Sequence, residues 1–366
     1  MPAEPSWLRI AADHYGLGRV RPMRHLRCFS SHYIVATDQC CYVLSQVERA
    51  TDRIPFTHQF DILRALRKAG VTVVREPIPT ENGAAYVETA RHYWFMRDFH
   101  FADPVIWRHR PSLIAQAART LAWIHVAGAH SDVVPVRHGG FDHGRLAPFY
   151  RTVEAFLDGV EDTYAGFDDR DLSVDDDALL RRTLDKLRAD RGAVLRECRA
   201  RGLTGITHHD YRPDNILVKD GRIIKVIDWD CAFTDHQMHD VAFAAFQFGQ
   251  RQRLRDTDLQ SVGIFLDAYL AARGLDGLPP SVTSWFLRFA VIKRLLINGS
   301  NAERMRLLRT LETAPRLASG RAGGRTDPGP GTARPLGRRR PVDVPVGRSA
   351  GVSTGRPVAV PVRGRA

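Results

Sequence analysis

The stretch GITHHDYRPDNILVKDGRIIKVIDWD, residues Gly205–Asp230, decides the fold and indicates the chemistry. Two short β-type runs, NILV and IIKVID, are joined by the turn sequence KDG, which predicts a small hairpin. Asp210 precedes this hairpin in a loop that Pro213 closes. A carboxylate held in such a loop can accept a proton from a hydroxyl group, so Asp210 is the candidate general base.

Two further oxygen-bearing side chains belong to the same stretch. Asn215 follows Asp210 by five residues, and Asp228 ends the second strand of the predicted hairpin. Mg²⁺ prefers one or two carboxylate or amide oxygens and takes its other ligands from water and phosphate, so these residues are the candidate metal ligands. Arg212 lies between the base and the ligands and adds a fixed positive charge that suits a phosphoryl group. The alternative is that these are ordinary turn and cap residues.

The order of these motifs resembles a known group of enzymes. HHDYRPDNIL resembles the catalytic loop of protein kinases and aminoglycoside phosphotransferases, in which His-x-Asp is followed by four residues and then Asn. VIDWD resembles the metal-binding Asp segment that follows, and HDVAFAAFQFG resembles the Asp-x-Ala helix start of the phosphotransferase branch. The chain looks most like the aminoglycoside, homoserine and spore-coat kinase-like phosphotransferases, because VIDWD stands where protein kinases have Asp-Phe-Gly and no Ala-Pro-Glu follows.

The resemblance implies a protein-kinase-like two-lobed α+β fold, with a small β-rich N-lobe and a larger α-helical C-lobe. It makes Asp210 the catalytic base, Arg212 the counterpart of a catalytic-loop lysine, and Asn215 and Asp228 the ligands of Mg²⁺. ATP or GTP would be the phosphate donor. The acceptor would be a hydroxyl group of a small molecule such as an aminoglycoside, an amino alcohol or a sugar-like compound.

The same resemblance implies supporting roles for residues outside these four. His208 would be a structural residue of the loop, and Asp240 would cap or anchor the helix that follows. The turn CFSSHY lacks the glycines of a Gly-rich loop, although Ser30 and Ser31 could present backbone amides to a phosphate. The backbone near Met96, in YWFMRDF, would meet the adenine.

The N-terminal part departs from the family pattern at an ion pair. Ser45, in YVLSQV, occupies the position of the phosphate-binding basic residue, and Gln59 is the best match for its partner glutamate. Losing both charges together is consistent, because a buried unpaired charge is costly. Two interpretations follow: an active phosphotransferase in which Arg212, the metal or Arg49 substitutes in part, or a degenerate kinase-like protein that binds nucleotide or a partner without efficient catalysis.

Hydrophobic patterning predicts two parts and a tail. HLRCFSSHYIVAT, QCCYVLSQV, VTVVREPIPT, AAYVETA and HYWFMRDF have strand character, and FTHQFDILRALRKAG has helical spacing, so the first hundred residues form a small sheet with one helix. Later segments such as PSLIAQAARTLAWIHVAGA are helical. We therefore expect an N-lobe at residues 1–102, a C-lobe at 103–318 and a tail at 319–366.

The tail accounts for most of the net charge. From Gly320 onward there are ten arginines and two aspartates, a net +8 of the whole-chain +12. Its Gly, Pro and Arg content cannot build a core, so we expect disorder. It could bind nucleic acid weakly through its arginines, but it lacks the aromatic residues that stack on bases, and a dispensable extension is the alternative.

Composition also bears on location and partners. No run of about 18 apolar residues occurs, and the N-terminus lacks the basic-then-apolar order of a signal peptide, so we expect a cytoplasmic protein without a membrane partner. The segment from Phe156 to Asp177 holds nine acids and one arginine. A cationic, amine-bearing acceptor would suit it. A solvated acidic loop that balances nearby arginines is the alternative.

Overall fold

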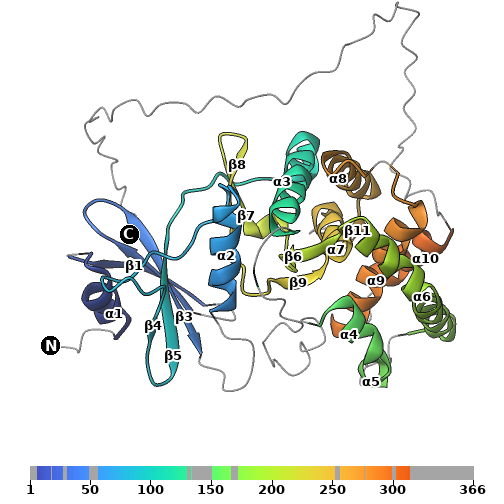
Figure 1. The fold of residues 1–366 in the computed structure, drawn as a ribbon, viewed down its shortest axis with the longest axis horizontal. Coiled ribbons are helices and arrows are strands. Elements are labelled where there is room, and N and C mark those ends of the chain that lie inside the picture. The colour runs from blue at the N-terminus through green and yellow to red at the C-terminus, as the bar shows by residue number, and fades with distance from the viewer. Residues whose placement is uncertain are drawn as a thin grey trace, which may run out of the picture. The chain divides into compact units, whose positions relative to one another are not determined.

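A computed structural model describes residues 6–17, 19–27, 31–48, 57–129, 133, 151–165, 172–251, 256–275, 277–298 and 302–313. The predictions for Ser30, Arg49 and the tail at 319–366 lie outside these residues. The described chain has a sheet in its first hundred residues and mostly helices after them (Figure 1).

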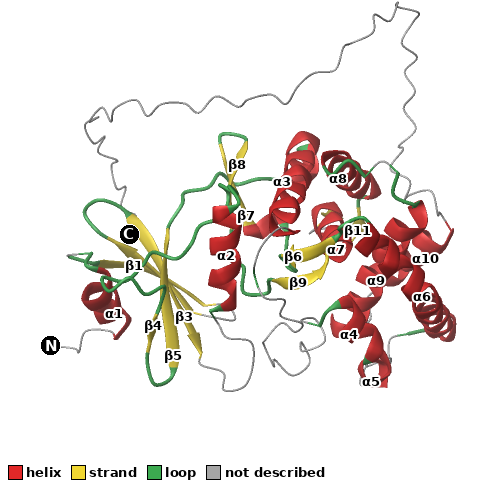
Figure 2. Cartoon of the chain, in the orientation of Figure 1, coloured by secondary structure: helices red, strands yellow, loops and turns green. Residues whose placement is uncertain are grey.

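The described residues of the N-terminal part form a five-stranded antiparallel sheet and two helices (Figure 2). The strands are β1 (Arg21–Arg27), β2 (Ser31–Ala36), β3 (Cys41–Glu48), β4 (Val87–Glu88) and β5 (His92–Asp98), in the spatial order β1-β2-β3-β5-β4. The helices are α1 (Ser6–Tyr15) and α2 (His58–Lys68). Strands β2, β3 and β5 are rich in β-branched and aromatic residues, which pack well on a pleated surface.

The two faces of this sheet pack against different helices. Leu44 and Met96 are fully buried in a cluster that includes residues of α1. Ser45 pairs with Phe95, and because side chains alternate along a strand, these two residues point to the opposite face. There the Phe95 ring lies 5.3 Å from the ring of Phe60 in α2. The face that carries Ser45 is therefore the one that α2 covers.

The C-terminal part is built from packed helices. They are α3 (Pro111–Ala129), α4 (Val153–Asp158), α5 (Val160–Ala165), α6 (Val174–Ala200), α7 (Gln237–Gly249), α8 (Leu259–Ala272), α9 (Pro280–Asn298) and α10 (Ala302–Thr313). Helix α3 packs against α8, α7 against both α8 and α9, and α9 against α6 and α10. The buried apolar faces of these helices join the Phe60–Phe95 contact in one hydrophobic core.

Short strands interrupt the helical part. They are β6 (Thr204–Thr207), β7 (Ile216–Lys219), β8 (Arg222–Val226), β9 (Phe233–His236), β10 (Gln250–Arg251) and β11 (Asp256–Thr257). Strand β6 pairs with β9, and β7 pairs with β8. In the β7–β8 turn, Asp220 and Gly221 have φ values of +49° and +70°. Two consecutive left-handed residues are what a type I′ hairpin needs, so the hairpin predicted at KDG is confirmed.

The α+β division predicted from the sequence is confirmed, with local differences. The prediction of a strand at VTVVREPIPT is wrong. Among these residues only Ile78 makes a β-bridge, an isolated one to Met96. Pro77 and Pro79 remove two of the backbone donors that a ladder would use. Helices α1 and α10 were not predicted.

The described residues belong to a single compact unit, so the boundaries at residues 102 and 318 stay predictions. Within the described chain, no helix combines the length and the apolar character needed to cross a lipid bilayer.

Candidate active site

Strand register brings the Asp210 loop and the Asp228 turn together. Thr207 pairs with Phe233 at the end of β6, and Ile216 pairs with Val226 at the start of β7. Two chain segments therefore connect the Thr207–Phe233 pair to the Ile216–Val226 pair. One runs from β6 to β7 and carries Asp210, and the other runs from β8 to β9 and carries Asp228. The Ile227 N–H donates to the Asn215 carbonyl at 3.0 Å and fastens one segment to the other.

Asn215 is bound to Asp210 through its side-chain nitrogen. Its Nδ2 donates to the Asp210 carbonyl oxygen at 2.8 Å and to Asp210 Oδ2 at 2.9 Å. These two acceptors fix the orientation of the amide, and they leave its oxygen, which can only accept, for another partner. A buried amide oxygen in such a position is a suitable ligand for a hard cation.

Asp228 is held in an unusual backbone conformation. Its φ of +68° lies in the left-handed region, which non-glycine residues adopt at a cost and which clusters at functional sites. Asp230 follows two residues later. Burial of its carboxyl group and then the Asp228 carboxylate raise the pKa of Asp230 to about 8, although the residue as a whole keeps contact with solvent. A divalent cation would relieve this repulsion, so the donor set fits Mg²⁺.

The charges around Asp210 act in opposite directions. Burial raises the pKa of the Asp210 carboxyl, Arg212 and His208 oppose that rise, and Asp228 adds to it. Arg212 Nε lies 3.4 Å from Asp210 Oδ2, and 41% of the Arg212 side chain is exposed. From α9, Arg294 also interacts with Asp210; burial and then Arg304 lower the pKa of Arg294 to about 10. Positive charge therefore gathers beside the candidate base.

Asp240 anchors the loop that carries Asp210. This fully buried carboxylate accepts hydrogen bonds from the backbone N–H of His208 at 2.7 Å and of His209 at 3.1 Å, and lies 3.1 Å from Nε2 of His125. Burial alone would raise the pKa of Asp240, but the hydrogen bond from His125 and nearby histidines hold it well below its usual range. These contacts tie α7 to the loop, and among the described residues no side-chain hydrogen bond caps the N-terminus of α7, so Asp240 acts as an anchor and not as a cap.

His208 links the two segments of the site. Its Nε2 lies 3.0 Å from the Ile227 carbonyl oxygen, and its Nδ1 accepts from the Asp210 N–H at 3.3 Å. Both hydrogen bonds form when the proton is on Nε2, because Nε2 then donates to the carbonyl and Nδ1 is free to accept. The ring therefore ties the backbone of Asp210 to the residue before Asp228, as a structural residue would.

A buried ionic cluster lies next to the loop. Ligand atoms of His209, Asp235 and His239 lie within 4.8 Å of one another, a spacing that a transition metal could accept. Lys293 is buried beside them, and burial lowers its pKa to about 7 while the charge of Asp235 opposes this. Because both oxygens of Asp235 already accept from the Val153 N–H at 3.2 Å and Lys293 interacts with the same carboxylate, we interpret the cluster as part of the core and not as a metal centre.

Ser45, at the position where the family has a basic residue, contacts an arginine from a neighbouring strand. Ser45 is fully buried, and its Oγ lies 2.9 Å from Nδ1 of His32 and accepts from Nη2 of Arg97 at 3.1 Å. Arg97 was missed in the sequence. The signal was present, since Arg97 is two residues beyond Phe95 and so shares its face of the sheet. Gln59, in α2, is buried as well.

The predicted nucleotide contacts lie at different places in the sheet. Ser31 begins β2 and pairs with Gln46 of β3. Met96 lies on the face that packs against α1, and its carbonyl accepts from the Ile78 N–H at 2.8 Å. The structure does not bring the Met96 side chain to the Asp210 group, and both contacts stay predictions.

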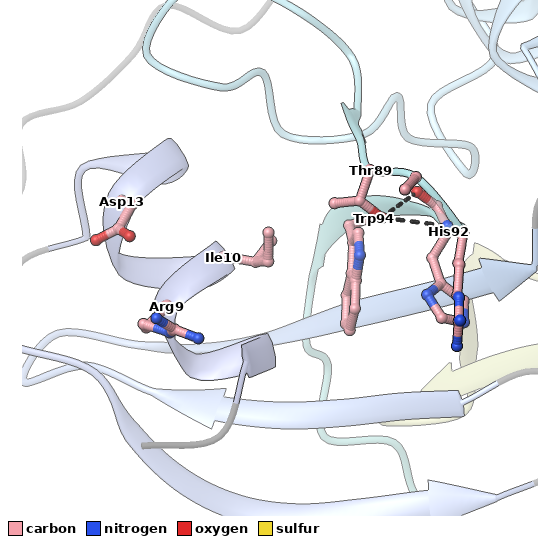
Figure 3. A pocket seen from close by; sticks show the side chains of 8 residues that line it. Arg9, Ile10, Asp13, Thr89, His92 and Trp94 are labelled. Atoms are coloured by element: carbon pink, nitrogen blue, oxygen red, sulfur yellow. Dashed lines mark hydrogen bonds between the residues drawn. The ribbon is translucent and has the colours of Figure 1, made fainter. Parts of the chain in front are cut away.

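A pocket of about 460 Å³ opens on the α1 side of the sheet (Figure 3). Ile10 of α1 points toward Trp94 of β5, and Thr89 and His92 exchange two hydrogen bonds at its rim. Trp94 belongs to the same cluster as Met96. The pocket therefore lies on the face opposite to Ser45 and is not part of the candidate active site.

Comparison with known families gives one match. The sequence model described as "Phosphotransferase enzyme family" matches residues 29–281, which include both Arg97 and the whole Gly205–Asp230 stretch. No curated protein matched the chain.

Several solved structures share the fold. An amicoumacin kinase, hAmiN, solved with AMP-PNP, Ca²⁺ and Ami, is 12% identical with a TM-score of 0.55, over 82% of this chain and 89% of that one. A microcompartment-associated aminopropanol kinase is 18% identical with a TM-score of 0.54, over 85% and 93%. An aminoglycoside phosphotransferase from Alicyclobacillus acidocaldarius is 18% identical with a TM-score of 0.51, over 87% and 95%. At these identities the likeness is one of fold.

Proposed function

Because the chain belongs to the phosphotransferase enzyme family, we propose that it transfers the γ-phosphate of ATP or GTP, with Mg²⁺, to a hydroxyl group of a small molecule. The observation that carries the proposal is the link between Asn215 and Asp210, since one amide holds the candidate base and leaves an oxygen for a cation. Phosphoryl transfer needs positioned charges more than covalent chemistry, and this site is built from positioned charges.

Each residue of the loop would then have a distinct task. Asp210, whose side chain is 20% exposed, would orient the acceptor hydroxyl and take its proton. Arg212 would place positive charge near the transferred phosphoryl group. Asn215 and Asp228 would hold Mg²⁺, which supplies charge neutralisation to the phosphates when it is bound. The nucleotide in the amicoumacin kinase structure supports a nucleotide as the donor.

The acidic segment gives little support for a cationic acceptor. Four of its described carboxylates contact arginines: the pairs are Asp158 with Arg191, Glu161 with Arg188, Asp176 with Arg309, and Asp177 with Arg181. This favours the alternative of an acidic segment that balances local arginines. Because Arg212 and Arg294 are the cations that interact with Asp210, an acceptor panel should include hydroxy acids and sugar phosphates beside amino alcohols and aminoglycosides.

A second candidate function is nucleotide or partner binding without efficient catalysis. It is favoured by the absence of a basic residue at Ser45 and of an acid at Gln59. Acceptor-dependent turnover separates the two candidates, because a protein that only binds nucleotide would show affinity without product.

Replacing Asp228 tests the metal assignment without knowledge of the acceptor. Asp228→Ala would remove one of the residues that would hold Mg²⁺ beside the phosphates, so affinity for Mg²⁺-ATP should fall by about tenfold or more. Isothermal titration with ATP in Mg²⁺ and in chelator measures the difference between the two. Asp214→Ala is the matched control, because Asp214 is an exposed carboxylate of the same loop, 3.8 Å from Arg212. A folded Asp228→Ala protein with undiminished Mg²⁺-ATP affinity would contradict the assignment.

A further inference from the structure

The sheet face that carries Ser45 contains a cation that the family pattern does not place there. Arg97 of β5 pairs with Val43 of β3, two residues along from the Ser45–Phe95 pair in the same register. Residues two apart in a strand share a face, so Arg97, Ser45 and Phe95 lie on the same side of the sheet. The missing basic residue of β3 thus has a basic neighbour on β5.

The contacts of Arg97 hold it in place without neutralising its charge. Its Nη2 donates to Ser45 Oγ at 3.1 Å, and its guanidinium lies 4.8 Å from the centre of the Phe95 ring. In the part of the chain that the structure describes, no carboxylate lies within 4.0 Å of Arg97. A guanidinium has five N–H donors in a planar fork, and a single serine hydroxyl uses only part of this capacity.

The charges that Arg97 faces come from the candidate metal turn. Burial lowers the pKa of Arg97, and the carboxylates of Asp228 and Asp230 oppose this. Arg97 therefore lies within electrostatic range of Asp228, the acid that would bind the cation of a Mg²⁺-nucleotide. The phosphates of a nucleotide bound at Asp228 would come within range of the same guanidinium, and arginine binds phosphate oxygens through paired N–H donors.

We propose that Arg97 is the phosphate-binding cation of the N-terminal part, that it replaces the basic residue absent at position 45, and that Ser45 positions it. The inference rests on the proposed function, since it concerns the same nucleotide. It explains why position 45 is small and neutral. A lysine there would compete with the guanidinium for buried space and would repel it, because both groups are cations.

The test compares ligands with and without phosphates. Arg97→Met keeps the approximate length of the side chain and removes its charge, so Mg²⁺-ATP should bind about 10- to 100-fold more weakly. Adenosine, which has no phosphate, should bind as it does to wild type. Arg64→Met is the matched control, because Arg64 is an exposed arginine of α2 that pairs with Asp61 and should change neither affinity. A merely structural role for Arg97 would weaken ATP and adenosine alike, and that result would overturn the inference.

Moving the charge provides a second, independent readout. Ser45→Lys alone should lower Tm and weaken Mg²⁺-ATP binding, because it crowds two cations. Ser45→Lys combined with Arg97→Ser should recover Mg²⁺-ATP affinity to above that of Arg97→Met, since one cation is restored to the face. Arg97→Lys should have an intermediate affinity, because it keeps the charge but loses the planar fork. A double variant no better than Arg97→Met would count against the replacement.

The outcomes separate this inference from the proposal on which it rests. If wild type does not bind Mg²⁺-ATP, both fall. If wild type binds Mg²⁺-ATP and Asp228→Ala weakens it while Arg97→Met does not, the proposed function stands and Arg97 is not the phosphate-binding cation.

Discussion

Asp210→Asn is expected to lower acceptor-dependent turnover at least about 100-fold, which is the effect of losing a general base. Asparagine has nearly the same shape, and its Oδ1 can still accept the hydrogen bond that Asn215 Nδ2 now donates to Asp210 at 2.9 Å. The loop should therefore keep its geometry, and affinity for Mg²⁺-ATP should stay near that of wild type. The measurement is steady-state kinetics together with nucleotide titration.

Asp214→Asn is the control for this change, because it makes the same substitution in an exposed residue of the same loop. It should leave turnover near the wild-type value. Asp210→Asn with turnover close to wild type would remove Asp210 from the chemistry. Loss of nucleotide affinity along with turnover would show instead that Asp210 contributes to binding.

Asp240→Asn is expected to lower the free energy of unfolding by about 3 to 5 kcal/mol, because it leaves buried hydrogen-bond donors without an acceptor and each such donor costs about 1 to 3 kcal/mol. Asp240 Oδ1 and Oδ2 now accept from the backbone N–H groups of His209 and His208, and Oδ2 also lies against His125. In asparagine one of these oxygens becomes an NH₂ group, which would face other hydrogen-bond donors and could not accept from them. For a domain of this size the loss corresponds to a fall in Tm of about 10 °C. Thermal unfolding followed by circular dichroism measures it.

Asp61→Asn provides the matched comparison for Asp240. Asp61 pairs with Arg64 at 3.2 Å on the exposed side of α2, and its loss should leave Tm near the wild-type value, because exposed ion pairs contribute little. Equal effects of the two substitutions would mean that Asp240 is not an anchor of the loop.

The family and the strand order around the loop could be predicted from the sequence for a physical reason. The residues from Gly205 to Asp230 are close in the chain, and a two-residue turn at Asp220 and Gly221 sets the register that brings Asn215 next to Ile227. The match of residues 29–281 to the phosphotransferase family confirms the resemblance and the enzyme class. The roles of the individual residues stay predictions.

The rest depended on contacts between distant segments. Arg97 meets Ser45 across 52 positions, and that contact exists only because β3 and β5 pair in one particular register. Asp240 reaches the backbone of His208 across 32 positions, so the resemblance, which implied a cap or anchor of the helix that follows, did not show this contact. Local patterns set turns and helix starts, but they do not set which strand lies beside which.

Transfer of labelled phosphate from ATP to a panel of acceptors is the most direct test of the proposed phosphotransferase activity. The panel should hold amino alcohols, aminoglycosides, sugars, hydroxy acids and sugar phosphates, each assayed with Mg²⁺ and with chelator. We expect a phosphorylated acceptor whose formation requires Mg²⁺ and is lost in both Asp210→Asn and Asp228→Ala. Phosphorylation that persists in folded Asp210→Asn and Asp228→Ala proteins, or Mg²⁺-ATP binding by wild type without transfer to any acceptor, would contradict this expectation.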